Sequence, residues 1–210
     1  VLWEAMIETL LSTIAPREDG SRYHVLFAGG VHDALSAAMV AAMSSTLAQR
    51  GVKVGVLMGT AYLFTKEAVD SGAIVKKFQE AAIDCDNTVL LETGPGHAIR
   101  CIDSPYKKVF NAKLKELALE QKSREQIREE LELMNLGRLR IASKGLSRSM
   151  SSLKGDELRS ELIAHQDNEK SRHQELVELS EDEQWDQGMY MIGQVAALKQ
   201  RICSMALLHE

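Results

Sequence analysis

The sequence predicts an α/β fold with parallel strands. Residues 24–27 and 52–58 are short, nearly continuous apolar runs, and a helical segment separates them. Such runs are typical of a parallel sheet covered on both faces, and parallel strands need a crossover such as a helix. Each run also ends in a small-residue turn, Ala28-Gly29-Gly30 and Met58-Gly59-Thr60. The segment is therefore predicted to be one βαβ unit.

Periodicity and helix-end signals predict the first two helices. In residues 2–14, apolar side chains recur on one helical face, which indicates an amphipathic helix. The helix of the βαβ unit is predicted to begin after Asp33, a suitable N-cap, and to run to Gln49, with Gly51 as its stop. Its expected apolar stripe consists of Leu35, Ala38, Met39 and Ala42.

The elements that follow are predicted in the same way. Short helices are expected near residues 65–68 and 75–83, and a third strand at residues 88–92 leads into the loop Thr93-Gly94-Pro95-Gly96-His97. Residues 107–134 are long, charged and helical by period, and residues 156–186 resume this character.

The predicted organisation has three parts. Residues 1–104 form βα units of a barrel, and residues 105–187 form an appended charged helical region with a Ser/Gly-rich loop near residues 143–155. Residues 188–210 are expected to form a C-terminal apolar helix, residues 189–208, that packs back on the barrel.

The two glycine turns are a candidate phosphate site. A phosphate group needs several N–H donors and little crowding, which the backbone of small residues at the end of a strand supplies. In a (β/α)8 TIM barrel, the loops after strands 7 and 8 commonly share one phosphate site at the C-terminal face. The two turns are therefore assigned to strands 7 and 8. An ordinary tight turn is the alternative for either turn taken singly.

Composition argues against several function classes. The net charge of −5 disfavours nucleic acid as a partner, because binding to phosphate backbones depends on clustered Lys and Arg. No apolar run is long enough to span a membrane and no signal peptide is evident, so a cytoplasmic location is expected. Cys85, Cys101 and Cys203 have no CxxC spacing, which predicts neither a disulfide framework nor a metal site.

The residues around the turns resemble the nitronate monooxygenase and FMN-dependent enoyl reductase family (2-nitropropane dioxygenase-like). AGGVHDALSAAMVAAM and VGVLMGTAYLFTKEAV are similar to its strand 7 to strand 8 segment, where the two turns hold the FMN phosphate. MYMIGQVAAL resembles its G-Q-x-A-G-L helix close to the cofactor. The FMN-binding residues that the resemblance implies are Ala28, Gly29, Gly30, Met58, Gly59, Thr60 and Gln194.

Two histidines are candidate catalytic residues. DNTVLLETGPGHAIRCIDSPYKKVF is similar to a family segment with G-H-P or G-R-P after a strand, which places His97 near the flavin, although Ala98 replaces the proline. His32 follows the first turn and is a second candidate. Ordinary loop positions are the alternative for both.

The strongest likeness is to enoyl reductase-like members associated with polyketide and polyunsaturated fatty-acid synthases. It implies that FMN, with NAD(P)H as electron donor, reduces an enoyl thioester. The alternatives are nitronate oxidation by oxygen and a non-catalytic assembly fragment of a multienzyme. Barrel strands 1 to 6 have no counterpart, so the chain is expected to be a C-terminal fragment that is inactive by itself.

A short basic stretch in this otherwise acidic chain suggests a docking site for a binding partner. Its members are Arg138, Arg140, Lys144 and Arg148. They could dock an acyl carrier protein or the arm of an acyl thioester, whereas the alternative is a solvated helix end. Assembly into a multienzyme or a homo-oligomer is a further expectation.

Overall fold

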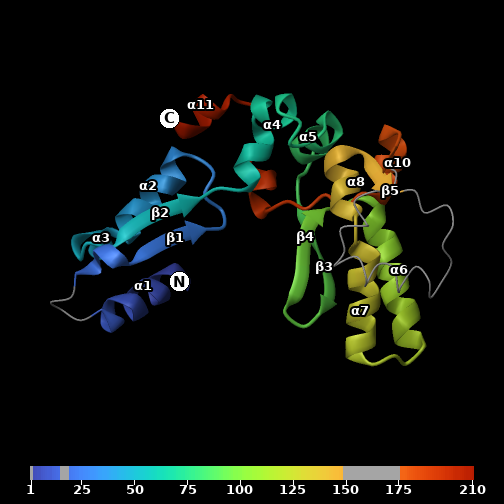
Figure 1. Cartoon of the computed structure of the whole chain (residues 1–210), viewed down its shortest axis with the longest axis horizontal. Helices are drawn as coiled ribbons and strands as arrows, with labels where there is room; N and C mark the ends of the chain where they lie inside the picture. Colours follow the sequence, from blue (N-terminus) through green and yellow to red (C-terminus); the bar gives the residue numbers. More distant parts are fainter. Residues whose placement is uncertain (1, 15–18, 149–175) are drawn as a thin grey trace.

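The computed structural model describes residues 2–14, 19–148 and 176–210 (Figure 1). The first elements are α1 (Leu2–Thr13), the short 3-10 helix η1 (Gly20–Arg22), β1 (His24–Ala28), α2 (Ala34–Met43), α3 (Ser45–Gln49) and β2 (Lys53–Leu57). Strands β1 and β2 are parallel neighbours, in a register that runs from His24 opposite Lys53 to Ala28 opposite Leu57. This confirms the predicted βαβ unit.

The parallel sheet is packed on one face. Val25 and Val54 lie opposite each other and join Phe27 in a hydrophobic cluster with α1, α2 and α3, in which the Trp3 and Phe27 rings meet edge to face, 5.5 Å apart. Leu26 and Leu57 alternate to the other face, where they are 69% and 58% exposed. The expectation of a sheet covered on both faces is thus wrong for the described chain, because the helices around this sheet contribute to a single cluster.

The helix between the strands differs from its prediction in two ways. It breaks at Ser44, whose buried hydroxyl donates to the Val40 carbonyl, 2.7 Å away. Its packed face carries Val40, which is buried, whereas the predicted stripe that begins at Leu35 is exposed. Nine of the ten positions of ALSAAMVAAM are apolar, so periodicity alone does not single out the face that packs.

The chain then passes through η2 (Thr60–Phe64), α4 (Lys66–Asp70) and α5 (Lys76–Ile83) to β3 (Thr88–Gly94) and β4 (His97–Ile102). The predicted third strand is present, but its partner β4 is antiparallel and was not predicted. The tight turn at Pro95-Gly96, where Gly96 has φ +78°, reverses the chain at once and so leaves no room for a parallel crossover.

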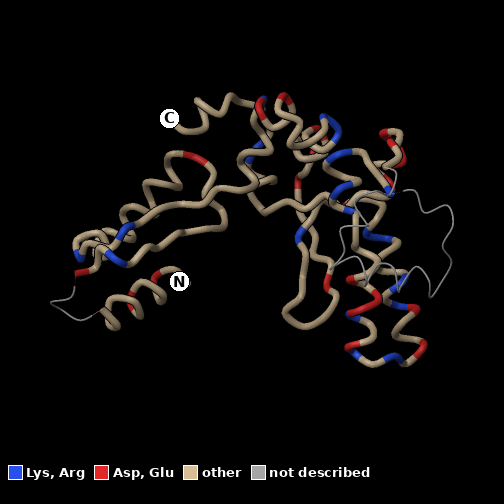
Figure 2. Tube along the Cα trace, in the orientation of Figure 1, with Lys and Arg blue, Asp and Glu red and all other residues tan. Residues whose placement is uncertain are grey.

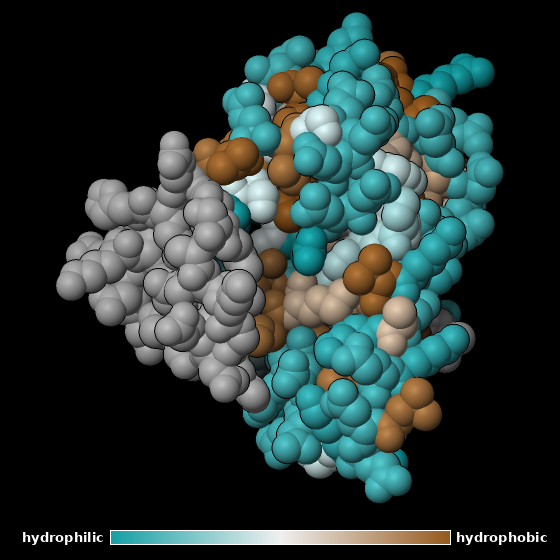
Figure 3. Space-filling model, turned by 90° about the vertical axis from the view of Figure 1, so that its right-hand side faces the viewer, coloured by the Kyte–Doolittle hydropathy of each residue, from teal (hydrophilic) through white to brown (hydrophobic). Residues whose placement is uncertain are grey.

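The charged region contains helices α6 (Pro105–Leu119), α7 (Arg124–Asn135) and α8 (Arg138–Lys144). The single helix expected over residues 107–134 is a helical hairpin. Gln121 has φ +56°, and Ser123 begins α7 with a capping box to Gln126. Figure 2 shows the dense charge on α6 and α7, and the surface seen from the right-hand side of Figure 1 is largely hydrophilic (Figure 3).

The last elements are β5 (Leu146–Arg148), β6 (Leu176–Glu178), α10 (Glu181–Gln187), η4 (Gln194–Leu198) and α11 (Met205–His209). Residues 149–175, which include most of the predicted loop at 143–155 and much of the helix expected over 156–186, lie outside the described residues. On either side of them, β5 and β6 form an antiparallel pair.

The single helix predicted over residues 189–208 is wrong. Residues 189–193 run extended beside β4, where the Ile102 N–H donates to the Tyr190 carbonyl at 3.0 Å and the Ile192 N–H donates to the Arg100 carbonyl at 3.1 Å, and only the short helices η4 and α11 follow. Pairing with the strand satisfies backbone groups that a helix would have satisfied within itself. Among the described helices, none combines the length and the apolar character needed to cross a membrane.

Burial of a cysteine thiol and a tyrosine phenol predicts a loss of stability at alkaline pH. Desolvation raises the pKa of the Cys101 thiol from 9.0 to about 11, and that of the Tyr106 phenol from 10.0 to about 12. The folded state therefore holds these protons more tightly than the unfolded state does. The free energy of unfolding should be unaffected below about pH 9 and should fall as the pH rises through the folded-state pKa values.

Urea titrations at about pH 8 and about pH 10.5 would measure this loss. The Cys101→Ala variant should start from a lower stability but lose less of it between the two pH values. An equal loss in both proteins would contradict the role of Cys101.

Candidate functional site

The structure brings the two glycine turns together. Ala28 and Leu57 are paired at the carboxyl ends of β1 and β2, so the segments that follow the two strands leave the sheet at the same edge. Gly29-Gly30 follows one strand and Met58-Gly59-Thr60 follows the other. Two loops far apart in the sequence thus form one small surface, which we call the glycine cup.

The backbone of the glycine cup leaves space above it. Gly29 and Gly30 have φ values of +92° and +89°, which side-chain-bearing residues rarely adopt. Gly59 has an ordinary φ of −115°. At all three, an added Cβ would meet no other atom within 4 Å, whereas at Gly20 it would lie 2.1 Å from the Arg50 carbonyl oxygen. The glycines of the cup therefore keep an open space clear, whereas Gly20 allows two segments to pack.

The glycine cup also offers hydrogen-bond donors. Among the described residues, the backbone N–H groups of Gly30, Gly59 and Thr60 make no turn or loop hydrogen bond, whereas Gly29 directly follows the ladder between β1 and β2. Backbone N–H groups of small residues beside open space are donors that suit a phosphate group. The residues present therefore fit the phosphate of FMN.

A hydrogen bond ties the C-terminal segment to the glycine cup. The Gly193 N–H donates to Thr60 Oγ1 at 2.8 Å, and a Cβ on Gly193 would lie only 2.7 Å from that oxygen. The approach therefore requires glycine, and it places Gln194, the exposed first residue of η4, beside the second turn. The Thr60 hydroxyl, which accepts this bond, keeps its own hydrogen to donate.

The two candidate histidines lie in different surroundings. His32 is at the glycine cup: its Nδ1 is 2.6 Å from the Gly30 carbonyl oxygen, and its side chain is 21% exposed. His97 begins β4, where its Nδ1 lies 3.9 Å from a carboxylate oxygen of Glu132 on α7. The structure thus places His32, and not His97, in contact with a predicted cup residue.

Asp33 caps the helix that follows the first turn. Its carboxylate accepts from the Ser36 N–H at 2.8 Å and from the Ser36 hydroxyl at 2.6 Å, and these bonds lower the pKa of Asp33. The start of α2 already holds a negative charge of the chain itself. The donors left for an external anion are therefore those of the turns.

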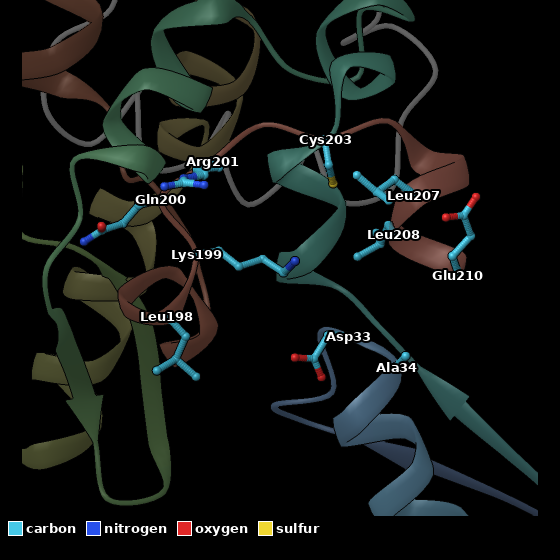
Figure 4. Close-up of a pocket in the computed structure, with 10 residues that line it drawn as sticks. All are labelled: Asp33, Ala34, Leu198, Lys199, Gln200, Arg201, Cys203, Leu207, Leu208 and Glu210. Carbon is cyan, nitrogen blue, oxygen red and sulfur yellow. The ribbon is translucent and has the colours of Figure 1, made fainter.

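A cavity of about 550 Å³ lies between the start of α2 and the C-terminal segment (Figure 4). Leu198, Leu207 and Leu208 give it apolar walls. Lys199 extends into it on the side facing Asp33 (Figure 4). This cavity was not predicted from the sequence, because residues 189–208 were expected to form a continuous helix.

The basic stretch is partly used within the fold. The Arg138 guanidinium stacks over the Tyr106 ring, 5.0 Å from its centroid, and its Nε lies 3.3 Å from the Met134 carbonyl oxygen. Lys144 donates to the Gly72 carbonyl. Both side chains thus join helices of this chain, which leaves Arg140 and Arg148 as the members of the stretch without such a bracing contact in the described chain.

These features define a mixed α/β fold with a parallel βαβ unit and a cup of two glycine turns at its carboxyl edge. The fold is similar to that of FabK from Thermotoga maritima, with a TM-score of 0.51 and 16% identity over 98% of this chain. A point mutant of FabK matches with a TM-score of 0.48 and 15% identity, over 98% of this chain and 43% of that chain. At this identity the likeness is one of fold.

The chain spans 46% of the length of that FabK structure. No protein-family model and no curated protein matches the sequence.

Proposed function

We propose that this chain supplies the phosphate-binding part of an FMN-dependent oxidoreductase. The observation that carries the proposal is the glycine cup, where two turns predicted from the sequence meet and the N–H groups of Gly30, Gly59 and Thr60 make no turn or loop hydrogen bond in the described chain. The open space at Gly29, Gly30 and Gly59 supports the same ligand, because a phosphate must approach the backbone closely.

We further propose that the reaction is reduction of an enoyl thioester, with NAD(P)H as the electron donor. The sequence resemblance to FMN-dependent enoyl reductases supports this choice, and the fold likeness to FabK agrees with it. Bound flavin would supply hydride transfer, while the residues of this chain orient the cofactor and neutralise its phosphate. NAD(P)H consumption with an enoyl thioester, rather than oxygen uptake with a nitronate, would support this reaction.

The direct test compares FMN with riboflavin, which lacks the phosphate. Flavin fluorescence titration should give tighter binding of FMN, by roughly tenfold or more, since hydrogen bonds to a charged group contribute about 1.5–3 kcal/mol each. Equal affinity for the two flavins, or no binding of either, would refute the proposal.

Gly59→Ala is a clean probe of the cup. Its φ of −115° suits alanine, and the new methyl group would point into open space, so the fold should be unaffected while a bound phosphate is crowded. We expect FMN affinity to fall roughly tenfold, and riboflavin affinity to change little.

The matched control is Gly94→Ala at the end of β3, where a Cβ would make an ordinary contact of 3.7 Å with the Arg128 side chain. This variant should bind FMN like the parent protein. Equal FMN affinity in both variants would show that Gly59 does not border the phosphate.

A further inference from the structure

The cavity between the start of α2 and the C-terminal segment contains the cationic side chain of Lys199. Lys199 directly follows η4, the element that the Gly193–Thr60 hydrogen bond fastens to the second turn. Within the described ranges, its ammonium group makes no hydrogen bond and no ion pair with a carboxylate. A side chain that reinforced the fold would be expected to have such a partner, as Lys107 has in Asp103 at 2.8 Å.

Contacts near each of the two glycine turns define the position of Lys199. Its own element is held at Thr60, while the cavity that it enters is closed on the other side by Asp33 and Ala34, just after the first turn. Figure 4 shows its side chain extending across the cavity between Asp33 and Cys203. Lys199 is therefore a positive charge that faces Asp33 across the cavity, three residues after the first turn.

The carboxylates of the cavity leave this charge available. Asp33 is occupied with the start of α2 through its bonds to Ser36, which are the main causes of its lowered pKa, and the charge of Lys199 is the smallest of the causes. Glu210, at the end of α11, points away from Lys199 in Figure 4. Leu198 and Leu207 line the same space but are 67% and 59% exposed, so a charge pair there is partly screened by solvent.

We propose that Lys199 is the counter-ion of a phosphate monoester bound at the glycine cup and its adjoining cavity. Backbone N–H groups orient the phosphate oxygens, and the ammonium neutralises part of the dianion. The inference rests on the proposed function, which offers two sources of this chemistry: the phosphate of FMN at the cup, and, with the cup filled by FMN, the 2′-phosphate of NADPH in the cavity, the group that distinguishes NADPH from NADH.

The experiment uses Lys199→Gln, with Lys199→Arg as the conservative variant. Lys53→Gln is the matched control, because it removes the same charge at the opposite end of β2 from the cup. One arm titrates each protein with FMN and with riboflavin. The other arm titrates the FMN-loaded proteins with NADPH and with NADH. Urea midpoints equal to that of the parent would show that the substitutions leave the fold intact.

If Lys199 faces the flavin phosphate, Lys199→Gln weakens FMN roughly tenfold without weakening riboflavin, and Lys199→Arg restores most of the loss. If it faces the dinucleotide, the tenfold loss appears with NADPH and not with NADH. Unchanged binding in both arms would overturn the inference. Failure of the proposed function is distinguishable, because the parent protein itself would then show no preference for FMN over riboflavin.

Discussion

Gly30→Val is expected to weaken FMN binding at least a hundredfold. Gly30 has φ +89°, a conformation in which a β-branched residue is a genuine outlier, so the turn must change shape and the Gly30 N–H is displaced. The branched side chain would also enter the space above the cup, where a Cβ meets no protein atom within 4 Å. Loss of one charge-assisted hydrogen bond together with steric crowding of the phosphate accounts for roughly a hundredfold or more.

Strain alone could also reduce binding, by destabilising the fold, and Gly72→Val controls for it. Gly72 lies between α4 and α5, has φ +69°, and its added Cβ would likewise meet nothing within 4 Å. Both variants should lower the urea midpoint to a similar extent, but only Gly30→Val should lose FMN in titrations under native conditions. Parallel loss of FMN in the two variants would mean that backbone strain, and not the cup, governs binding.

Local signals in the sequence predicted the βαβ unit well and the later elements poorly. Strands β1 and β2 are apolar runs bounded by turn residues, and Asp33 and Gly51 mark the ends of the helical segment between them. The partner of a strand is not a local property. Thr88–Gly94 was recognised as a strand, but its pairing with β4 depends on a turn only two residues long.

Residues 189–193 show the same limit more sharply. Their composition suits a helix, but the free edge of β4 offers hydrogen bonds to Tyr190 and Ile192, and burial of Tyr190 favours the extended form. Tertiary contact thus overrides local preference. A pattern read along one segment contains no information about the edge on which that segment will lie.

The candidate site likewise has parts that the sequence predicts and parts that depend on the folded chain. The sequence indicated both turns because glycines after strands are visible locally, and the structure places them at one edge of the sheet. The Thr60–Gly193 hydrogen bond joins residues 133 positions apart, and the position of Lys199 depends on that bond. Such contacts exist only once the chain has folded. The residues next to Lys199 in the sequence therefore could not predict where its side chain lies.

Removal of one buried hydroxyl should destabilise the protein, and removal of another should stabilise it. The Tyr106 hydroxyl lies 2.8 Å from Asn135 Oδ1 and 3.0 Å from the Met134 carbonyl oxygen, and thereby connects α6 to the end of α7. Tyr106→Phe leaves the buried Asn135 Oδ1 without this donor, while the Met134 carbonyl keeps Arg138 Nε, so the free energy of unfolding should fall by about 1–2 kcal/mol. Tyr190 is fully buried, and in the described chain its hydroxyl has no hydrogen-bond partner.

The opposite sign for Tyr190→Phe follows from the cost of burying an unpaired hydroxyl. Phenylalanine keeps the ring that packs against Phe78 and Trp185, at centroid distances of 5.2 and 5.3 Å, and removes only the oxygen. The free energy of unfolding should rise by about 1 kcal/mol. Urea denaturation followed by circular dichroism measures both variants under the same conditions. Because the same oxygen is deleted from two buried rings, a loss of stability in both would show that Tyr190 makes a bond that holds this core together.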